Sequence, residues 1–165
     1  MIFVTVGTHE QPFDRLVAYM DQLKETGVLT EEVIIQTGFS TYEPKHCRWQ
    51  KLFPYKEMVR MVDEARIVIT HGGPSSFIMP LQIGKIPVVV PRQKQFEEHV
   101  NDHQLVFAKA LAERQGNLIV VEDIAQLKDI LLNYPEIVAS IPTDMKSNNE
   151  KFNDAVRKIV AEMFR

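Results

Sequence analysis

A turn with two glycines and two serines is the part of this sequence best suited to hold an anion. It reads His71-Gly72-Gly73-Pro74-Ser75-Ser76 and directly follows a short β-branched segment. Paired glycines permit close approach to the backbone, and Ser75 or Ser76 could begin a helix whose free N–H groups and dipole attract a pyrophosphate. The alternative is a common strand-to-helix turn with a serine cap. Pro80 falls inside the expected helix, so we expect that helix to start late or to bend.

A second polar segment, EEHVNDHQ at residues 97–104, follows Pro91 and Arg92. If this segment opens a helix, Val100, Phe107 and Leu111 form its buried stripe. Gln104 falls on the same stripe. A buried amide needs hydrogen-bond partners, and sugar hydroxyls could provide them. The alternative is a solvated first turn whose acidic residues complement the helix dipole.

A third polar segment, Gly7-Thr8-His9-Glu10, precedes a helix that we expect to begin near Pro12. A histidine with the ordinary pKa of about 6.5 could act as a general base or as a hydrogen-bond donor, although a plain surface histidine is the commoner outcome. The three segments contain four of the five histidines, His9, His71, His99 and His103. Since no histidine pair has a third ligand at a zinc-type spacing, we expect no metal site.

Short β-branched runs alternate with stretches of helical periodicity along the chain, and several of these runs are apolar on both faces. This pattern predicts an α/β fold, a Rossmann-like open parallel sheet with helices on both faces. Ligands of such sheets bind outside the carboxyl ends of the strands, where the three polar segments lie. The expected strands are residues 2–6, 33–37, 67–70, 88–90 and 118–121. Residues 39–51 fit either a loop with a short strand or an extended excursion.

The expected helices each carry an apolar stripe. The stripes are Phe13, Leu16, Val17, Met20 and Leu23; Tyr55, Met58, Val59, Val62 and Ala65; Leu127, Ile130 and Leu131; and Phe152, Val156, Ile159, Val160 and Met163.

The composition is that of an ordinary globular protein of 165 residues, which we expect to form a single domain over residues 1–165. The net charge of -3 disfavours nucleic acid as a partner. The single cysteine, Cys47, cannot form an internal disulfide, and no run reaches the roughly 18 apolar residues of a membrane span. We therefore expect a cytoplasmic protein that would need a partner to work at a membrane.

Three motifs in this order resemble one family. They are VTVGTHEQPFD at residues 4–14, HGGPSS at 71–76, and Pro91-Arg92 followed by EHVNDHQ at 98–104. The chain resembles the small subunits of split glycosyltransferases that build bacterial exopolysaccharide and capsule. It is similar to the soluble subunit of the eukaryotic dolichol-linked N-acetylglucosaminyltransferase and, more distantly, to the carboxyl-terminal domain of family-28 glycosyltransferases. The resemblance covers nearly the whole chain and implies the carboxyl-terminal half of a GT-B fold.

The resemblance also implies residue roles. The expected diphosphate and nucleotide contacts are Gly7, Thr8, His71, Gly72, Gly73, Ser75 and Ser76. The expected sugar contacts are Glu98, Asn101, Asp102 and Gln104. His9 is the candidate catalytic base, although a partner could supply the base instead. Relatives often hold ribose with a glutamate where this chain has Met79, so another group would have to replace that contact.

The resemblance implies an inverting UDP-sugar-dependent transferase subunit with no cofactor and no obligatory metal. A membrane-associated subunit would supply the amino-terminal half of the fold and hold a lipid-linked saccharide acceptor, keeping this chain at the inner face of the membrane. A terminal helix over residues 143–165 would either cap the core or dock that partner. The alternative function is a non-catalytic module that binds a nucleotide sugar or stimulates a partner transferase. An oxidoreductase is disfavoured because Gly7 is not followed by the spaced glycines of a dinucleotide turn.

Overall fold

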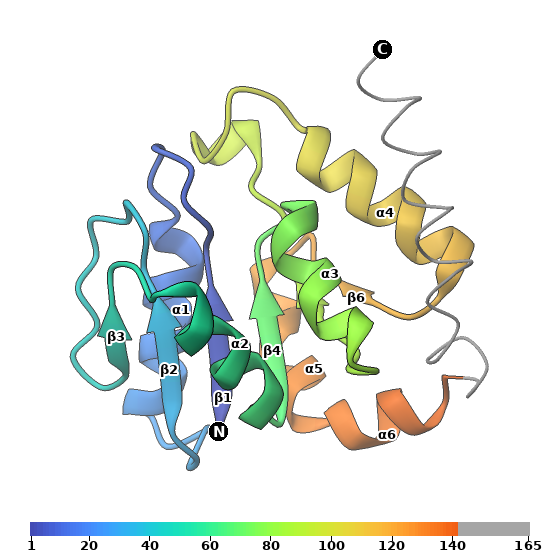
Figure 1. The fold of residues 1–165 in the computed structure, drawn as a ribbon. Helices are drawn as coiled ribbons and strands as arrows, with labels where there is room; N and C mark the ends of the chain where they lie inside the picture. The colour runs from blue at the N-terminus through green and yellow to red at the C-terminus, as the bar shows by residue number, and fades with distance from the viewer. Residues whose placement is uncertain (142–165) are drawn as a thin grey trace.

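The computed structural model describes residues 1–141, which form a six-stranded parallel sheet covered by helices on both faces (Figure 1). The strand order is β3-β2-β1-β4-β5-β6, and all five strand pairs are parallel. The expected helix over residues 143–165 lies outside the described residues. The strands are β1 (Ile2–Thr5), β2 (Val33–Gln36), β3 (Arg48–Gln50), β4 (Ile67–Thr70), β5 (Val88–Val89) and β6 (Ile119–Val120).

The α/β open-sheet prediction is confirmed, and each of the five expected strands contains an observed one. Every residue of β1, β2 and β4 is buried, which is why these strands are recognisable as apolar runs. The sixth strand, β3, lies at the sheet edge and all three of its residues are exposed. Residues 39–51, for which the sequence allowed two interpretations, therefore form a loop followed by a short edge strand. This strand has no apolar pattern by which it could be predicted.

Helices pack on each face of the sheet according to the alternation of side chains along the strands. Ile2 and Val4 of β1 face the cluster that includes α1 and α5, whereas Phe3 faces the cluster that includes α2. A third cluster joins α3 to α4. The helices are α1 (Asp14–Glu25), α2 (Tyr55–Glu64), α3 (Pro74–Gln82), α4 (His103–Gln115), α5 (Leu127–Leu132) and α6 (Tyr134–Ala139), with 3-10 turns η1 (Lys94–Phe96) and η2 (Ile124–Gln126).

Two expected apolar stripes are wrong in part. On α2, Tyr55 is 74% exposed and Val59 is exposed, because the helix packs through Met61 together with the expected residues Val62 and Ala65. Val100 is also exposed and precedes α4, which begins only at His103. The rest of the second prediction is confirmed, since Phe107 and Leu111 of α4 are buried.

Helix α3 begins directly after the glycines, so the expected late start is wrong. Gly73 is the N-cap residue and Pro74 occupies the first turn, where a proline costs no hydrogen bond and its fixed φ suits a helix. Neither serine caps the helix with its side chain. Pro80 lies inside the helix, two residues before its last residue, Gln82.

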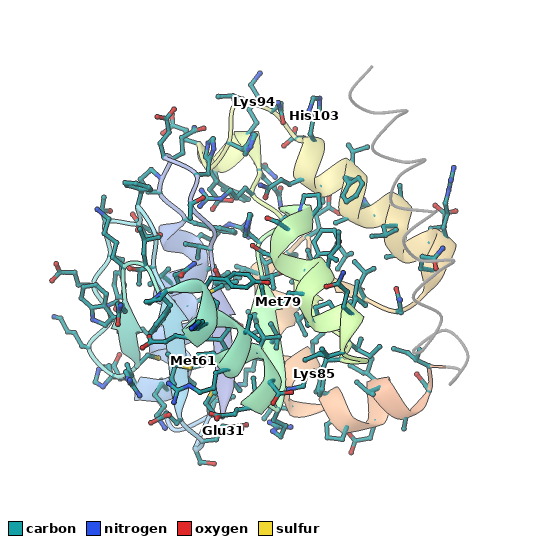
Figure 2. All side chains as sticks on the ribbon, in the orientation of Figure 1. Glu31, Met61, Met79, Lys85, Lys94 and His103 are labelled. Carbon is teal, nitrogen blue, oxygen red and sulfur yellow. The ribbon has the colours of Figure 1, made fainter. Side chains whose placement is uncertain are left out.

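The strand order decides where a ligand can bind. The chain runs outward from β1 through β2 to β3, then crosses to β4 on the other side of β1 and runs outward to β6, so a crevice opens outside the carboxyl ends of β1 and β4. The three polar segments of the sequence follow β1, β4 and β5 and therefore meet at this edge. Figure 2 shows Lys94 and His103 at the same edge, with Glu31 at the opposite one.

Candidate functional site

A cleft of about 680 Å³ lies at the carboxyl ends of β1 and β4. One wall is polar and contains Thr8, His9 and Ser75. Another part of the lining is apolar and contains Leu52 and Phe53. The cleft is also lined by Thr5, Gly7, Gln36, Tyr55, Met58, Val62, His71, Ser76 and Met79. A ligand with a flat apolar part and an anionic part would match these two parts of the lining.

A smaller pocket of about 240 Å³ lies beside the cleft and is lined by Gly72, Gly73, Asn101 and Gln104, among others. Gly72 and Gly73 line only this pocket, whereas Ser75 and Ser76, two and three residues past Gly73, line only the cleft. The turn between β4 and α3 thus separates the two spaces. An elongated ligand could occupy both if its middle crossed the turn.

The side chain of His71 shapes this turn from inside. Its Nδ1 accepts the backbone N–H of Gly73 at 3.1 Å, so Nε2 carries the proton and donates to Oγ of Ser76 at 2.9 Å. Burial, with a further contribution from the charge of Arg92, lowers the pKa of His71 to about 3. The ring is therefore neutral at physiological pH and serves as a scaffold for the turn.

The glycines of the site are needed for packing against the protein's own side chains. A Cβ atom on Gly7 or on Gly73 would overlap with the imidazole of His71. A Cβ atom on Gly72 would lie 2.7 Å from Cβ of Gln104. Gly72 and Gly73 were expected to allow the approach of a ligand, but close contact with Gln104 and His71 already requires them.

Gln104 connects the turns that follow β4 and β5. Its Oε1 accepts the backbone N–H groups of Gly72 and Arg92, both at 3.1 Å. Because these two groups occupy Oε1, contact with a sugar would fall to the Nε2 amide. The side chain lines the smaller pocket together with Asn101, whose Oδ1 accepts the backbone N–H of His103 at 3.0 Å.

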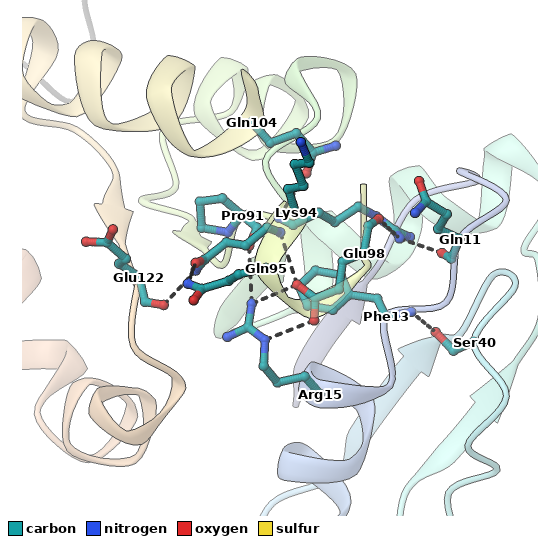
Figure 3. Close-up of polar contacts among 12 residues, drawn as sticks. Gln11, Phe13, Arg15, Ser40, Pro91, Lys94, Gln95, Glu98, Gln104 and Glu122 are labelled. Atoms are coloured by element: carbon teal, nitrogen blue, oxygen red, sulfur yellow. Dashed lines mark hydrogen bonds and ion pairs between the residues drawn. The ribbon is translucent and has the colours of Figure 1, made fainter. Parts of the chain in front are cut away.

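Glu98 and Asp102 do not join Asn101 and Gln104 in the pocket. Glu98 is 2% exposed, and its carboxylate accepts hydrogen bonds from Nε and Nη2 of Arg15 at 2.9 and 3.0 Å (Figure 3). It also accepts the backbone N–H of Gln93 at 3.1 Å. Asp102 accepts the backbone N–H of Lys94 at 2.9 Å. The expectation that both contact a sugar is therefore not matched by their placement, because each carboxylate is directed to a loop of the protein itself.

Arg92, which belongs to the third sequence motif, has a central structural role that the sequence did not indicate. Its side chain is fully buried, and its guanidinium donates to the carbonyl oxygens of Val6 at 2.7 Å, Gln11 at 2.6 Å and Glu98 at 3.0 Å. Burial lowers the pKa of Arg92 to about 10, which leaves it positively charged at neutral pH. One charge thus joins the loops after β1 and β5.

Gln36 was missed entirely, because it is the polar last residue of an apolar strand. Its Nε2 donates to Oγ1 of Thr5 at 2.9 Å, and its Oε1 accepts the backbone N–H of Phe53 at 2.9 Å. Oγ1 of Thr5 also accepts the backbone N–H of Gly7 at 3.2 Å. Gln36 therefore holds the apolar wall and the first polar loop in a fixed relation.

His9 and His99 form a stacked pair that was not foreseen. Their ring centroids are 4.4 Å apart and the planes differ by 14°. His9 lines the cleft, whereas His99 lines the smaller pocket. Nε2 of His9 donates to Oε1 of Gln11 at 2.8 Å, which leaves its Nδ1 with the lone pair. The pair therefore spans the division between the two spaces.

Within residues 1–141, no three His, Cys, Asp or Glu side chains are grouped in a way that could hold a metal ion. No helix of the same residues is long and apolar enough to cross a membrane.

Comparisons with known proteins agree with this geometry. The model of the glycosyltransferase family 28 C-terminal domain matches residues 1–160. The UDP-N-acetylglucosamine transferase subunits ALG13 of Homo sapiens and Mus musculus are both 33% identical to this chain, over 71% and 70% of its length. The chain spans 10% of the length of these two relatives.

Solved structures share the fold at low identity. The glycotransferase of kitacinnamycin superposes with a TM-score of 0.59 and 18% identity, over 98% of this chain and 42% of that one. MurG of Acinetobacter baumannii superposes with a TM-score of 0.52 and 18% identity, over 96% of this chain and 49% of that one. The fold is thus that of the carboxyl-terminal half of a GT-B glycosyltransferase. The chain belongs to the glycosyltransferase family 28 C-terminal domain family, which confirms the resemblance found in the sequence.

The contact between Gly7 and His71 makes a testable prediction. Gly7 and Gly27 both have φ of +77°, but only at Gly7 would a Cβ meet another group, because nothing lies within 4 Å at Gly27. Gly7→Ala should therefore lower the free energy of unfolding by about 1–3 kcal/mol more than Gly27→Ala, as measured by urea denaturation. In a His71→Ala background the two substitutions should cost about the same. Equal costs in the wild-type background would contradict the packing role.

Proposed function

We propose that this chain is the donor-binding subunit of an inverting, UDP-sugar-dependent glycosyltransferase that acts on a lipid-linked saccharide in polysaccharide synthesis. The observation that carries the proposal is the pair of spaces on either side of the turn between β4 and α3, at the crevice of a GT-B half. A nucleotide sugar has the matching form, with a nucleoside and a sugar joined by a diphosphate. Family membership supports the transferase reaction.

The nucleoside is assigned to the cleft of about 680 Å³. Leu52 and Phe53 offer apolar surface for the base, and the exposed ring of Tyr55 lines the same cleft. Met79 also lines the cleft, at the position where relatives often have a glutamate for ribose. A thioether is a weak hydrogen-bond acceptor, so the ribose hydroxyls must find polar partners elsewhere in the cleft.

The diphosphate is assigned to the start of α3, where the helix dipole favours an anion. The backbone N–H groups of Gly72, Gly73 and Ser76 already donate to groups within the protein, and Pro74 has none. Among the described residues that line the cleft, the N–H of Ser75 and the hydroxyls of Ser75 and Thr8 are the donors we assign to phosphate oxygens.

The sugar is assigned to the smaller pocket, with the Nε2 amide of Gln104 and the side chain of Asn101 as its contacts. His9 is the candidate base, because Nδ1 keeps a lone pair and the ring lies at the cleft wall. The solved transferases extend over about twice this chain, since it covers 42% and 49% of two of them. We propose that a membrane-associated partner supplies the acceptor-binding half and holds this subunit at the cytoplasmic face.

Donor binding through Ser75 requires no metal ion in this proposal. Isothermal titration with UDP should show binding that is unchanged by EDTA. Ser75→Ala should lower the affinity for UDP by about tenfold, because it removes a hydrogen bond to a charged group. Ser140→Ala, at the end of α6, is the matched control and should leave the affinity unchanged. No binding by the folded protein, or binding only with a divalent cation, would contradict the proposal.

Gln104 can be tested without removing its structural role. Gln104→Glu keeps an oxygen acceptor for the N–H groups of Gly72 and Arg92 but removes the Nε2 donor. The added charge should lower the affinities for UDP and for the UDP-sugar alike, so the informative quantity is the ratio of the two affinities. We expect the preference for the matching UDP-sugar over UDP to fall about tenfold. An unchanged ratio would show that Nε2 does not contact the sugar.

His9 can be tested by turnover in the complex that contains the acceptor-binding half. His9→Ala should lower kcat by about 100-fold or more with little change in the KM for the donor, because a general base acts in the chemical step. His46→Ala is the control, since that exposed histidine lies in the loop before β3. Near-normal turnover of His9→Ala would assign the base to the partner.

A further inference from the structure

The stacked pair His9–His99 lies between the two spaces that we assign to the two ends of the nucleotide-sugar donor. His9 lines the cleft assigned to the nucleoside, and His99 lines the pocket assigned to the sugar. A diphosphate that joins the two parts crosses the turn next to both rings. This placement rests on the proposed function, because it takes the two spaces as the two ends of one nucleotide sugar.

We propose that His99 takes up one proton from solvent when the donor diphosphate binds, so that the stacked pair is cationic only in the occupied site. The proton adds to Nδ1 of His99, since Nε2 already carries one. Protonation of Nδ1 removes the hydrogen bond that it accepts from the backbone N–H of Asn101. That bond is long, at 3.4 Å. Binding of the anion and binding of the proton then favour each other, because each lowers the electrostatic cost of the other.

The surroundings of His99 keep it neutral without a ligand. Burial, together with the charges of His9, Arg92 and His103, lowers the pKa of His99 below its usual value. Arg92 approaches from the segment after β5 and His103 from the start of α4. Burial and the fixed charge of Arg92 therefore oppose a positive charge on His99 when no ligand is bound.

The nearby acids do not offset this repulsion directly. The Glu98 carboxylate is bonded to Arg15 and to the backbone of Gln93, and Asp102 is bonded to the backbone of Lys94. His71 is neutral at physiological pH, since its pKa is about 3. A bound diphosphate would bring two negative charges to a site whose fixed charge is Arg92. The diphosphate is thus the group that makes protonation of His99 favourable.

A protonated ring remains compatible with the stack. An imidazolium above a neutral imidazole gains a cation–π contact, which is strongest where water is excluded. The hydrogen bond from Nε2 of His9 to Gln11 does not involve Nδ1, the atom assigned to base catalysis. The two histidines of the pair therefore have separate tasks, charge compensation for His99 and base catalysis for His9.

The sign of the pH dependence follows from the linkage. The ligand raises the pKa of His99, so donor affinity is highest at low pH and falls as the pH rises through the pKa of the bound state. The probe must not titrate itself. UDP-glucose, UDP-galactose and UDP-N-acetylglucosamine meet this requirement between about pH 6 and 8, because their phosphates are diesters, unlike the terminal phosphate of UDP with its pKa of about 6.

The experiment is isothermal titration of the full chain with whichever of these three UDP-sugars binds, in buffers of different ionisation enthalpy. We expect uptake of up to about one proton for each donor bound, and an affinity that falls by up to about tenfold per pH unit between pH 6 and 8. His99→Gln should abolish the uptake and the pH dependence. His46→Gln, the matched control, should retain both.

Two further measurements keep the inference testable if His99→Gln does not fold. In the wild-type chain, the NMR titration of the His99 ring should show a higher pKa with the UDP-sugar than without it. His9→Phe keeps an aromatic stacking partner and should retain proton uptake while losing turnover. Binding with no proton uptake and an unchanged pKa of His99 would overturn this inference and leave the proposed function standing. Absence of binding by all three UDP-sugars would count against both.

Discussion

The buried guanidinium of Arg92 is the interaction on which the arrangement of the site depends. A charge taken out of water is costly unless hydrogen bonds compensate for it, and Arg92 finds three carbonyl oxygens from the ends of two distant loops. Its Nε remains without a hydrogen-bond partner, so the compensation is incomplete. The loops after β1 and β5 must therefore keep the positions that satisfy Arg92. This constraint brings His9 against His99.

An ion pair between Arg15 and Glu98 reinforces the same junction. Arg15 at the start of α1 holds the Glu98 carboxylate, and its guanidinium also lies 4.4 Å from the ring centroid of Phe96. Glu98 in turn offers its backbone carbonyl to Arg92. The two motifs that begin at Gly7 and at Pro91 are thus parts of one connected unit, although more than 80 residues separate them in the chain. Their joint presence in the sequence has a structural cause as well as a functional one.

The turn between β4 and α3 illustrates how packing and binding share the same residues. His71 fills the space beneath Gly7 and Gly73, and Gln104 fills the space beside Gly72. These contacts use backbone N–H groups that a simple phosphate-binding turn would offer to its ligand. The site is therefore more rigid and poorer in free backbone donors than its glycines suggest. Side-chain hydroxyls and the charge at the His9–His99 pair gain importance as a result.

The sequence by itself determined the class of fold and the edge of the sheet where the site lies. Runs that are buried on both faces show their apolar character locally, and a parallel sheet brings the ends of such strands together. Only the tertiary structure decided which side chains face the ligand. Local periodicity placed Val100 and Tyr55 in buried stripes, but packing against neighbouring elements left both exposed. Glu98, Arg92 and His99 each have a partner far away in the chain, and no local pattern records contacts between residues brought together only by folding.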